Sequence, residues 1–223
     1  MKAMILAAGR GERMRPLTDH TPKPLLHIGK HRLIEYHLMN LAKAGFKNIV
    51  INVAWLGKQI CDTIGNGSKY GVNISYSDEG DSALETGGGI FKALPLLGEQ
   101  PFLVINGDIW TNYPCQTLHH HTPQGLAHLV LVNNPPQHPL GDFYLRDNKL
   151  VEHGDTKFTF SGIGVYKKEF FAEKNGGAFP LAPMIREFAT QGLISAELYQ
   201  GEWDDIGTVE RLNARIKKQA PVV

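Results

Sequence analysis

The chain has 223 residues, a formal net charge of +1 and a hydrophobic fraction of 42%. This length suits one α/β domain with a large core, and the balanced charge gives no reason to expect nucleic acid as a partner. The two cysteines, Cys61 and Cys115, form no C-x-x-C pair, which excludes a zinc site or disulfide framework of that kind. With no signal peptide and no apolar stretch of about 18 residues, we expect a cytoplasmic protein without a membrane partner.

The first predicted element is a buried strand over residues 2–8, which opens into a loop rich in glycine and basic residues. Gly9 and Gly11 allow the backbone to approach a ligand closely, and their amide groups can face phosphate oxygens. Arg13 and Lys23 supply positive charge that can balance a phosphate. The loop therefore predicts a binding site for the phosphates of a nucleotide.

Two other phosphate-binding loops do not fit this segment. No Gly-Lys-Ser or Gly-Lys-Thr sequence occurs, which excludes a Walker A loop. A dinucleotide fingerprint, G-x-G-x-x-G, can begin at Gly9, but Met14 stands where its third glycine is required. Pro16 also limits helix formation at the residue before it. An NAD-dependent oxidoreductase is therefore rejected.

Helices and strands alternate after this loop. The apolar pattern predicts a helix over residues 33–44, a strand over 48–53, a helix over 56–64 and a strand over 72–76. Together with the first strand, this alternation predicts a Rossmann-like α/β fold with a mixed, mostly parallel sheet flanked by helices.

A triple glycine at residues 87–89 precedes the next helical pattern. We interpret it as a phosphate or base contact at a helix N-terminus, with a tight turn as the alternative. An apolar strand over residues 101–105 then leads through Asn106 to Asp108. Ligands of open α/β sheets lie beyond the carboxyl ends of the strands. We therefore expect Asp108 in the same crevice as the first loop.

The pattern changes from Ala127 onward. Short strand candidates with turn signals between them lie at residues 128–132, 143–145, 150–151, 158–160 and 162–166. Such strands predict an antiparallel elaboration at one edge of the sheet, a suitable place for a second substrate. Two further helices are expected over residues 181–190 and 209–218.

Two aspartates are the carboxylates best placed for chemistry. Asp205 lies in the segment W-D-D-I-G-T at residues 203–208, just before the last predicted helix, where an N-terminal helix cap is the alternative role. Asp108 is either a functional carboxylate or a turn residue after its strand. Residues 119–121 are three consecutive histidines, which point in different directions on any regular element, so we expect a solvated polar stretch there and not a metal site.

Three of these motifs together resemble the sugar-1-phosphate nucleotidyltransferases. They are G-x-G-x-R-M-x-P-L-T at residues 9–18 followed by Pro22-Lys23, the aspartate after the central strand, and W-x-D-x-G-T at residues 203–208. The resemblance runs from residue 2 to about residue 214. It implies a single nucleotidyltransferase domain over residues 1–223, with a nucleotide-binding half over about 1–126 and a sugar-phosphate-binding half with the C-terminal helix over about 127–223.

The same resemblance implies a reaction. A nucleoside monophosphate is transferred from a nucleoside triphosphate, expected to be UTP, to a sugar 1-phosphate, while Asp108 and Asp205 hold Mg²⁺. The catalytic residues implied are Arg13, acting on the β- and γ-phosphates and the leaving pyrophosphate, and Lys23, acting on the α-phosphate and the incoming phosphate. A phosphate dianion is already a nucleophile, so no general base is required.

Two sets of binding residues are implied as well. The nucleotide-binding set lies in the first half: Leu6, Ala8, Gly9, Gly11, Glu12, Arg13, Lys23, Glu79, Glu85, Thr86, Gly87 and Asn106. The sugar-binding set lies in the second half: Gly141, Asp142, Glu152, Ser161 and Gly162. The chain departs from the family at two of these positions. Glu85 replaces the first glycine of the usual L-G-T-A-G, and residues 151–154 read V-E-H-G in place of V-E-K-P.

A narrower resemblance is carried by residues 34–38, 54–57, 84–98 and 126–132. It is to family members that use UTP and N-acetylmuramate 1-phosphate in the recycling of cell-wall sugars. The alternatives are a mannose- or glucose-1-phosphate nucleotidyltransferase that uses GTP or dTTP, and a nucleotide-sugar sensor that keeps the fold without catalysis. A monomer or small homo-oligomer is expected.

Overall fold

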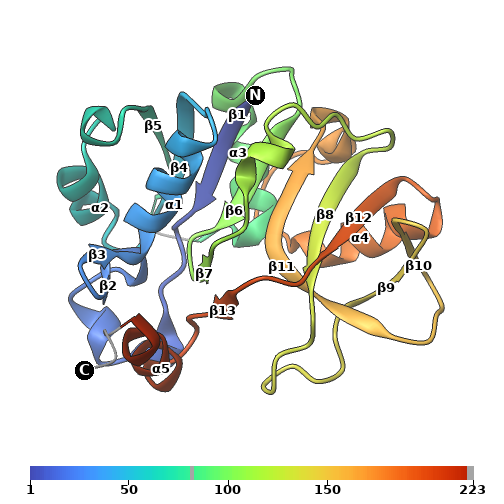
Figure 1. Cartoon of the computed structure of the whole chain (residues 1–223). Helices are drawn as coiled ribbons and strands as arrows, with labels where there is room; N and C mark the ends of the chain where they lie inside the picture. The colour runs from blue at the N-terminus through green and yellow to red at the C-terminus, as the bar shows by residue number, and fades with distance from the viewer. Residues whose placement is uncertain (81–82, 220–223) are drawn as a thin grey trace.

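The computed structural model describes residues 1–80 and 83–219. Nine strands form one mixed sheet in the order β5-β4-β1-β6-β11-β8-β12-β10-β9, with helices on both of its faces (Figure 1). Two small ribbons, β2–β3 and β7–β13, lie outside this sheet. In the described part of the chain, no helix has the length and apolar character needed to cross a membrane.

The bounds of the elements are as follows. The strands are β1 Lys2–Leu6, β2 His27–Ile28, β3 His31–Arg32, β4 Asn48–Val53, β5 Asn73–Asp78, β6 Phe102–Asn106, β7 Ile109–Thr111, β8 Ala127–Val132, β9 Phe143–Arg146, β10 Lys149–Val151, β11 Lys157–Tyr166, β12 Ile194–Tyr199 and β13 Trp203–Asp205. The α-helices are α1 Leu33–Lys43, α2 Gly57–Ile64, α3 Glu85–Leu97, α4 Leu181–Thr190 and α5 Val209–Gln219. Short 3₁₀ helices occupy Glu12–Met14, Leu17–Asp19, Lys23–Leu25, Ser68–Tyr70, Cys115–Leu118 and Lys168–Phe171.

The first half of the chain builds the parallel part of the sheet. Strands β5, β4, β1 and β6 are all parallel, and Ile5 at the centre of β1 pairs with Ile51 on one side and Ile105 on the other. Their carboxyl ends therefore lie at one edge of the sheet. The predicted α/β fold with a mixed sheet is confirmed.

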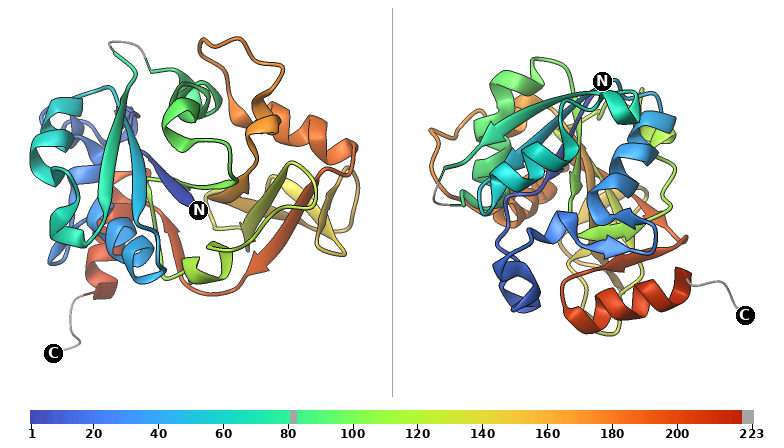
Figure 2. Two further views of the ribbon diagram at one scale, coloured as in Figure 1. Left: turned by 90° about the horizontal axis from the view of Figure 1, so that it is seen from above. Right: turned by 90° about the vertical axis from the view of Figure 1, so that its left-hand side faces the viewer.

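Neighbouring residues of the central strand β1 pack into two separate hydrophobic cores, one on each face of the sheet. Ile5 belongs to the cluster beneath α1 and α2, whereas Met4 belongs to the cluster beneath α3 and α4. Figure 2 shows these helix pairs on opposite faces of the sheet. Because side chains alternate along a strand, a strand buried on both faces needs an unbroken apolar run, which explains the first element of the sequence.

The second half continues the same sheet, which corrects the expectation of an elaboration confined to an edge. β11 lies in the middle of the sheet, antiparallel to both β6 and β8, and β9, which ends the strand order after β10, pairs back onto the first residues of β11. The two strand candidates at residues 158–160 and 162–166 are one strand. Its register shifts between Phe160 and Ile163, and Gly162 within this bulge has φ +82°, which is why the apolar pattern is interrupted there.

The triple glycine lies inside α3, which begins at Glu85, and not in a loop before the helix. A Cβ at Gly87 would overlap the ring of Phe179, and one at Gly88 would overlap the backbone of residue 177. The amides of Gly87 and Gly88 both donate to the Phe179 carbonyl, at 3.0 and 3.1 Å. These two glycines therefore serve close packing, and their amides are not free for a phosphate.

The alternative role of Asp205, an N-terminal helix cap, does not apply. Asp205 ends strand β13, and the residue that caps α5 is Thr208, whose Oγ1 accepts a hydrogen bond from the Arg211 amide at 3.3 Å. Strand β12 and both ribbons were not predicted. The ribbon strands have only two or three residues each, which is too short to produce a recognisable alternation.

Candidate active site

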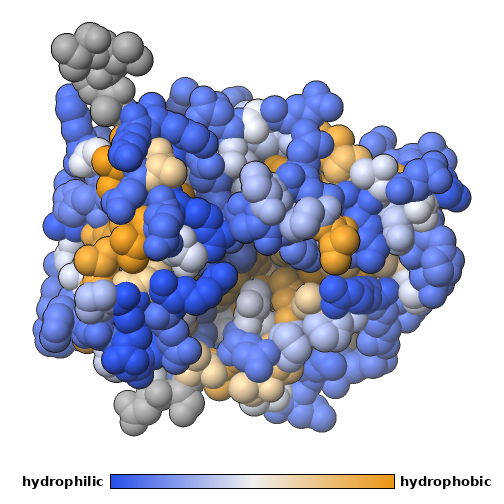
Figure 3. Space-filling view, turned by 90° about the horizontal axis from the view of Figure 1, so that it is seen from below, coloured by the Kyte–Doolittle hydropathy of each residue, from blue (hydrophilic) through white to orange (hydrophobic). Residues whose placement is uncertain are grey.

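A crevice of about 600 Å³ opens where the strands β1, β4 and β6 end. Figure 3 looks onto this side of the molecule and shows a hollow between two rims on which hydrophilic residues predominate. Its lining includes every residue of the expected nucleotide-binding set except Gly87, and in addition Ala7, Arg10, Pro24, Asn52, Ala83, Gly107, Asp108 and Gly207. The position of the crevice agrees with the expectation for an open α/β sheet.

The glycine-rich loop forms one wall of this crevice. Gly11 has φ +70°, and a Cβ on it would lie 3.0 Å from the Thr18 side chain, so any other residue would be strained there. Gly9 differs, because no atom lies within 4 Å of the position of its Cβ. Among the described residues, nothing accepts a hydrogen bond from the amides of residues 8–11. The loop thus presents free backbone donors next to open space, as a phosphate site requires.

Lys23 reaches the same crevice from the 3₁₀ helix Lys23–Leu25. Its side chain is 9% exposed, and its Nζ donates to Oδ2 of Asp108 at 2.8 Å. A lysine this deeply buried needs a charged partner, because an isolated ammonium loses its hydration when it is buried. The carboxylate of Asp108 is 40% exposed and therefore remains open to solvent on its other side.

The two expected metal ligands come together on the β7–β13 ribbon. Asp205 pairs with Ile109 in the antiparallel register, and the amide of Ile206 donates to the Asp108 carbonyl at 2.9 Å. Asp108, Asp205 and Arg13 all line a smaller hollow of about 190 Å³ that adjoins the crevice. The structure thus brings both aspartates and Arg13 to one place.

Asp205 forms an ion pair with Arg211, whose Nη1 lies 2.5 Å from Oδ2 of the carboxylate. Each of the two aspartates is therefore neutralised by one basic side chain of the protein itself, Asp108 by Lys23 and Asp205 by Arg211. In the described part of the chain, no three histidine, cysteine or acidic side chains are arranged to hold a metal ion. Mg²⁺ does not need three, since it keeps several waters and binds through one or two carboxylates and phosphate oxygens. Asp108 and Asp205 fit such an ion.

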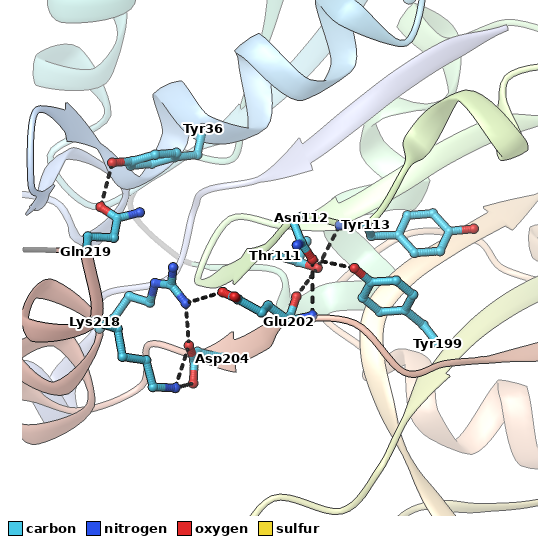
Figure 4. A network of polar contacts seen from close by, with 10 residues as sticks. Tyr36, Thr111, Asn112, Tyr113, Tyr199, Glu202, Asp204, Lys218 and Gln219 are labelled. Atoms are coloured by element: carbon cyan, nitrogen blue, oxygen red, sulfur yellow. Dashed lines mark hydrogen bonds and ion pairs between the residues drawn. The ribbon is translucent and has the colours of Figure 1, made fainter. Parts of the chain in front are cut away.

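Helix α5 holds the ribbon in position. Arg215, whose side chain is 6% exposed, lies 3.0 Å from Glu202 and 3.1 Å from Asp204, the two acidic residues on either side of Trp203. Lys218 adds a second cation, 2.9 Å from Asp204 (Figure 4). These contacts fix the backbone of β13 just before Asp205.

Glu79 and Glu85 mark the other end of the crevice. Glu79 is buried and accepts hydrogen bonds from Asn52 Nδ2 at 2.6 Å and from the Leu84 amide at 2.8 Å. Asn52 in turn accepts from the Ala7 amide at 2.8 Å, so this network ties together the segments after β1, β4 and β5. Both oxygens of Glu79 are thus occupied by the protein.

Glu85 has φ +58°, a left-handed conformation that costs a residue other than glycine about 1 kcal/mol. This conformation explains why glycine is usual at the position in the family. Glu85 is exposed and faces the crevice, whereas Gly87 of the same expected set is buried under Phe179.

The expected sugar-binding residues are less concentrated. Ser161 lines the smaller hollow, but its Oγ donates to the Val130 carbonyl at 2.7 Å. Asp142 accepts from the Phe160 amide at 2.8 Å and contacts His138 at 3.0 Å, so its carboxylate supports the loop before β9.

The other members of the sugar-binding set line none of the hollows described above. Gly141 packs against Asn134, and Gly162 packs against Asn106. The side chain of Glu152 is 66% exposed, and its Oε1 lies 3.8 Å from Nε2 of His153. The structure therefore brings Ser161 to the crevice but leaves Glu152 on the surface.

Several lining residues were missed by the sequence analysis. Gln137 and His138 belong to the proline-rich loop after β8 and line the smaller hollow. Trp203 was not missed, since it belongs to the W-x-D-x-G-T motif; it lines the same hollow, and its indole donates to the Ser161 carbonyl at 2.9 Å. Arg10 lines the larger crevice, and Arg211 pairs with Asp205. Arg211 follows the W-x-D-x-G-T motif at a fixed spacing, which is a usable signal, but the proline-rich loop offered none.

His37 lies beneath the site on α1. Complete burial of its ring lowers the pKa to about 4, while a hydrogen bond to the Ile109 backbone and the charge of Asp108 oppose this shift. The ring is therefore neutral at pH 7. Of the three consecutive histidines, His119 packs edge-on against Phe46 and His121 lies beside His128, so they are packed at the surface and not gathered around a metal.

Comparison with known proteins places the chain in a family. Residues 2–220 match the nucleotidyl transferase family. The chain belongs to this family. The predicted resemblance to sugar-1-phosphate nucleotidyltransferases is thereby confirmed, and members of the family generally act with a divalent metal ion.

Individual relatives agree with this assignment. The chain is 53% identical over 221 residues to an N-acetylmuramate alpha-1-phosphate uridylyltransferase of Neisseria meningitidis serogroup B, with 95% of each chain covered. It is 32% identical over 220 residues to a protein of the same name from Caulobacter vibrioides, covering 92% of this chain and 91% of that one. Among solved structures, a putative glucose-1-phosphate thymidylyltransferase from Bacillus anthracis has the same fold, with a TM-score of 0.88 at 20% identity, covering 100% of this chain and 96% of that one.

Proposed function

We propose that the protein transfers uridylate from UTP to N-acetylmuramate 1-phosphate, releasing pyrophosphate. The observation that carries this proposal is the 53% identity to a uridylyltransferase of that specificity over almost the whole of both chains. The crevice supports the reaction type, because Arg13, Lys23, Asp108 and Asp205 converge there. A cytoplasmic role in the recycling of cell-wall sugars forms part of the same proposal.

The residues of the crevice would divide the work between binding and charge stabilisation. The free amides of residues 8–11 and the guanidinium of Arg13 would bind the β- and γ-phosphates and stabilise the leaving pyrophosphate. Lys23 would turn from Asp108 toward the α-phosphate and the incoming phosphate oxygen. Mg²⁺ on Asp108 and Asp205 would supply further positive charge at the nucleotide oxygens.

The bond changes need no proton transfer. A phosphate oxygen of the sugar 1-phosphate forms a bond to the α-phosphorus, and the bond from that phosphorus to the bridging oxygen of pyrophosphate breaks. Because the attacking group is an anion, the protein contributes positioning and electrostatic stabilisation and no general base. None of the described residues that line the large crevice is a histidine, which is consistent with this chemistry.

The lining residues support separate roles for the two halves of the chain. We assign nucleotide binding to residues 1–126, where all lining residues of the large crevice except Gly207 lie. We assign the sugar phosphate to the half from residue 127 onward, where Ser161 and the Gln137–His138 segment line the same small hollow as the two aspartates.

A substrate matrix tests the proposal. The protein is incubated with Mg²⁺ and each of four nucleoside triphosphates against several sugar 1-phosphates, and pyrophosphate release is measured. We expect release only with UTP and N-acetylmuramate 1-phosphate, and none when divalent ions are chelated with EDTA. Release with GTP or dTTP and mannose or glucose 1-phosphate would instead identify the alternative nucleotidyltransferase activity.

A catalytically silent sensor of nucleotide-sugars is the remaining alternative. It is disfavoured because the four charged residues expected for catalysis are present together at one site. Binding of UTP without pyrophosphate release from any pair in the matrix would favour it over an enzyme.

A further inference from the structure

Arg10 is the middle residue of the Gly9–Gly11 turn and lines the large crevice together with Arg13 and Lys23. Its side chain is exposed, and its guanidinium carbon lies 4.2 Å from the centre of the Trp55 ring. The motif G-x-G-x-R assigns Arg13 but leaves the position of Arg10 open. The role of this second arginine is therefore not contained in the family pattern.

The Trp55 ring is a fixed support for this guanidinium. Its indole Nε1 donates to the Thr18 carbonyl at 2.9 Å, which ties the segment after β4 to the phosphate loop. Trp55 lies in a tight turn closed by a hydrogen bond from the Gly57 amide to the Ala54 carbonyl at 2.9 Å. Both hydrogen bonds hold the ring beside Arg10.

Arg10 and Arg13 differ from the third arginine of the loop. Arg15 is paired with Asp19, with its Nε 2.7 Å from the carboxylate. Within residues 1–80 and 83–219, neither Arg10 nor Arg13 forms an ion pair with a carboxylate. A guanidinium held only by an aromatic ring keeps all its N–H donors for an anion, and its planar fork matches two phosphate oxygens.

We propose that Arg10 is a second arginine for the terminal phosphates of the nucleoside triphosphate and for the pyrophosphate that leaves. Trp55 acts as its positioning residue, because it holds the guanidinium at the crevice before the ligand binds. This inference rests on the proposed function for the identity of the ligand. It adds a binding residue and the residue that orients it.

Calorimetric titration of the whole protein with Mg²⁺ and UTP, UMP or pyrophosphate tests the inference. The variant Arg10→Ala should bind UTP and pyrophosphate about tenfold more weakly, which is typical for the loss of charge-assisted hydrogen bonds. Its affinity for UMP should not change, because UMP lacks the β- and γ-phosphates. The matched control Arg15→Ala, which removes a paired arginine from the same loop, should bind all three ligands like the unaltered protein.

The positioning role of Trp55 has its own test. Trp55→Phe keeps an aromatic ring but loses the hydrogen bond to Thr18, and it should weaken pyrophosphate binding less than Arg10→Ala does. In the Arg10→Ala background the same change should have no further effect. Independent, additive effects of the two substitutions would overturn the role of Trp55.

The outcomes separate this inference from the proposed function. Unaltered pyrophosphate affinity in Arg10→Ala, or an equal loss of UMP affinity, would overturn the role of Arg10 while uridylate transfer still stands. If the unaltered protein binds Mg²⁺–UTP but releases no pyrophosphate in the substrate matrix, the transfer activity fails and Arg10 is retained as a phosphate-binding residue. If it binds neither UTP nor pyrophosphate, both fail.

Discussion

The two halves of the central sheet place their polar residues in different ways. In the first half, β5, β4, β1 and β6 are parallel, so the segments that follow them share one edge and line one crevice. In the second half the strand directions are mixed: β8 and β12 end at the same edge as β6, whereas β11, which carries a bulge, and β10 end at the opposite edge. A polar residue after a strand therefore marks the site in the first half and carries far less information in the second.

The largest effect should come from the carboxylate at the boundary of the two halves. We expect Asp108→Asn to lose all detectable pyrophosphate release, because the variant removes both a proposed metal ligand and the charge opposite Lys23. The variant should still fold, but its melting temperature should fall, because the substitution leaves the buried ammonium of Lys23 without its charged partner. Near-normal turnover would mean that a polar residue after a parallel strand does not mark the active site even in the first half.

Lys23→Ala should have the next largest effect. Since its ammonium is proposed to act on the reacting phosphates, kcat should fall by about 10³-fold, the lower range for a cation that stabilises phosphoryl transfer. Steady-state kinetics separate kcat from KM for UTP. A change confined to KM would mean that Lys23 binds the substrate in the ground state and is not a catalytic residue.

Lowering the pH should reduce the free energy of unfolding through protonation of His37, which lies in the first half of the chain. Its pKa is lowered to about 4 in the folded protein, below the value of an unfolded histidine, so the folded state binds fewer protons. The contribution of the neutral His37 ring to the free energy of unfolding is fully present above pH 6.5. As the pH falls from 6.5 to 4, the free energy of unfolding should decrease by about 3 kcal/mol.

Urea unfolding of the protein and of His37→Gln across that pH range measures this contribution. Burial also lowers the pKa of His119 and His121, so the difference between the two proteins is the relevant quantity. We expect the variant to show a shallower pH dependence. Parallel curves for the two proteins would contradict the lowered pKa of His37.

The smallest effect on catalysis is expected for a substitution in the second half of the chain, at Glu152. Glu152 was expected to bind sugar from the resemblance, but its side chain is 66% exposed and lies outside the hollows around the aspartates. Glu152→Ala should therefore change kcat/KM for the sugar 1-phosphate less than about twofold. A loss of tenfold or more would show that the antiparallel half also presents its site at strand ends.

The sequence predicted the site correctly where residues that follow similar local patterns also lie close together in the fold. Apolar runs followed by glycine, asparagine or aspartate located β1 and β6 and the residues after them, because parallel strands bring those positions to one edge. The Gly9–Gly11 turn was recognised from residue type alone. Its left-handed Gly11 and the open space at Gly9 show that the two glycines have different reasons to be there.

The remaining features depend on contacts between distant segments. The pairing of β7 with β13 involves only three residues on each side, yet it is what brings Asp108 and Asp205 together. The glycines of α3 are explained by the segment around Phe179, nearly a hundred residues away, and no local pattern reports that contact. The hydrogen bonds that occupy Ser161 and Glu79 likewise come from other strands.

The β7–β13 ribbon has a consequence for the order in which the protein becomes active. During translation, residues 1–111 emerge from the ribosome first and carry the phosphate loop, Lys23 and Asp108. The second aspartate follows only at position 205, and the α5 residues Arg215 and Lys218, which fix its strand, emerge later still. A nascent chain can therefore complete its nucleotide loop long before it can hold both carboxylates, so transfer cannot begin before residues 205–218 have been synthesised.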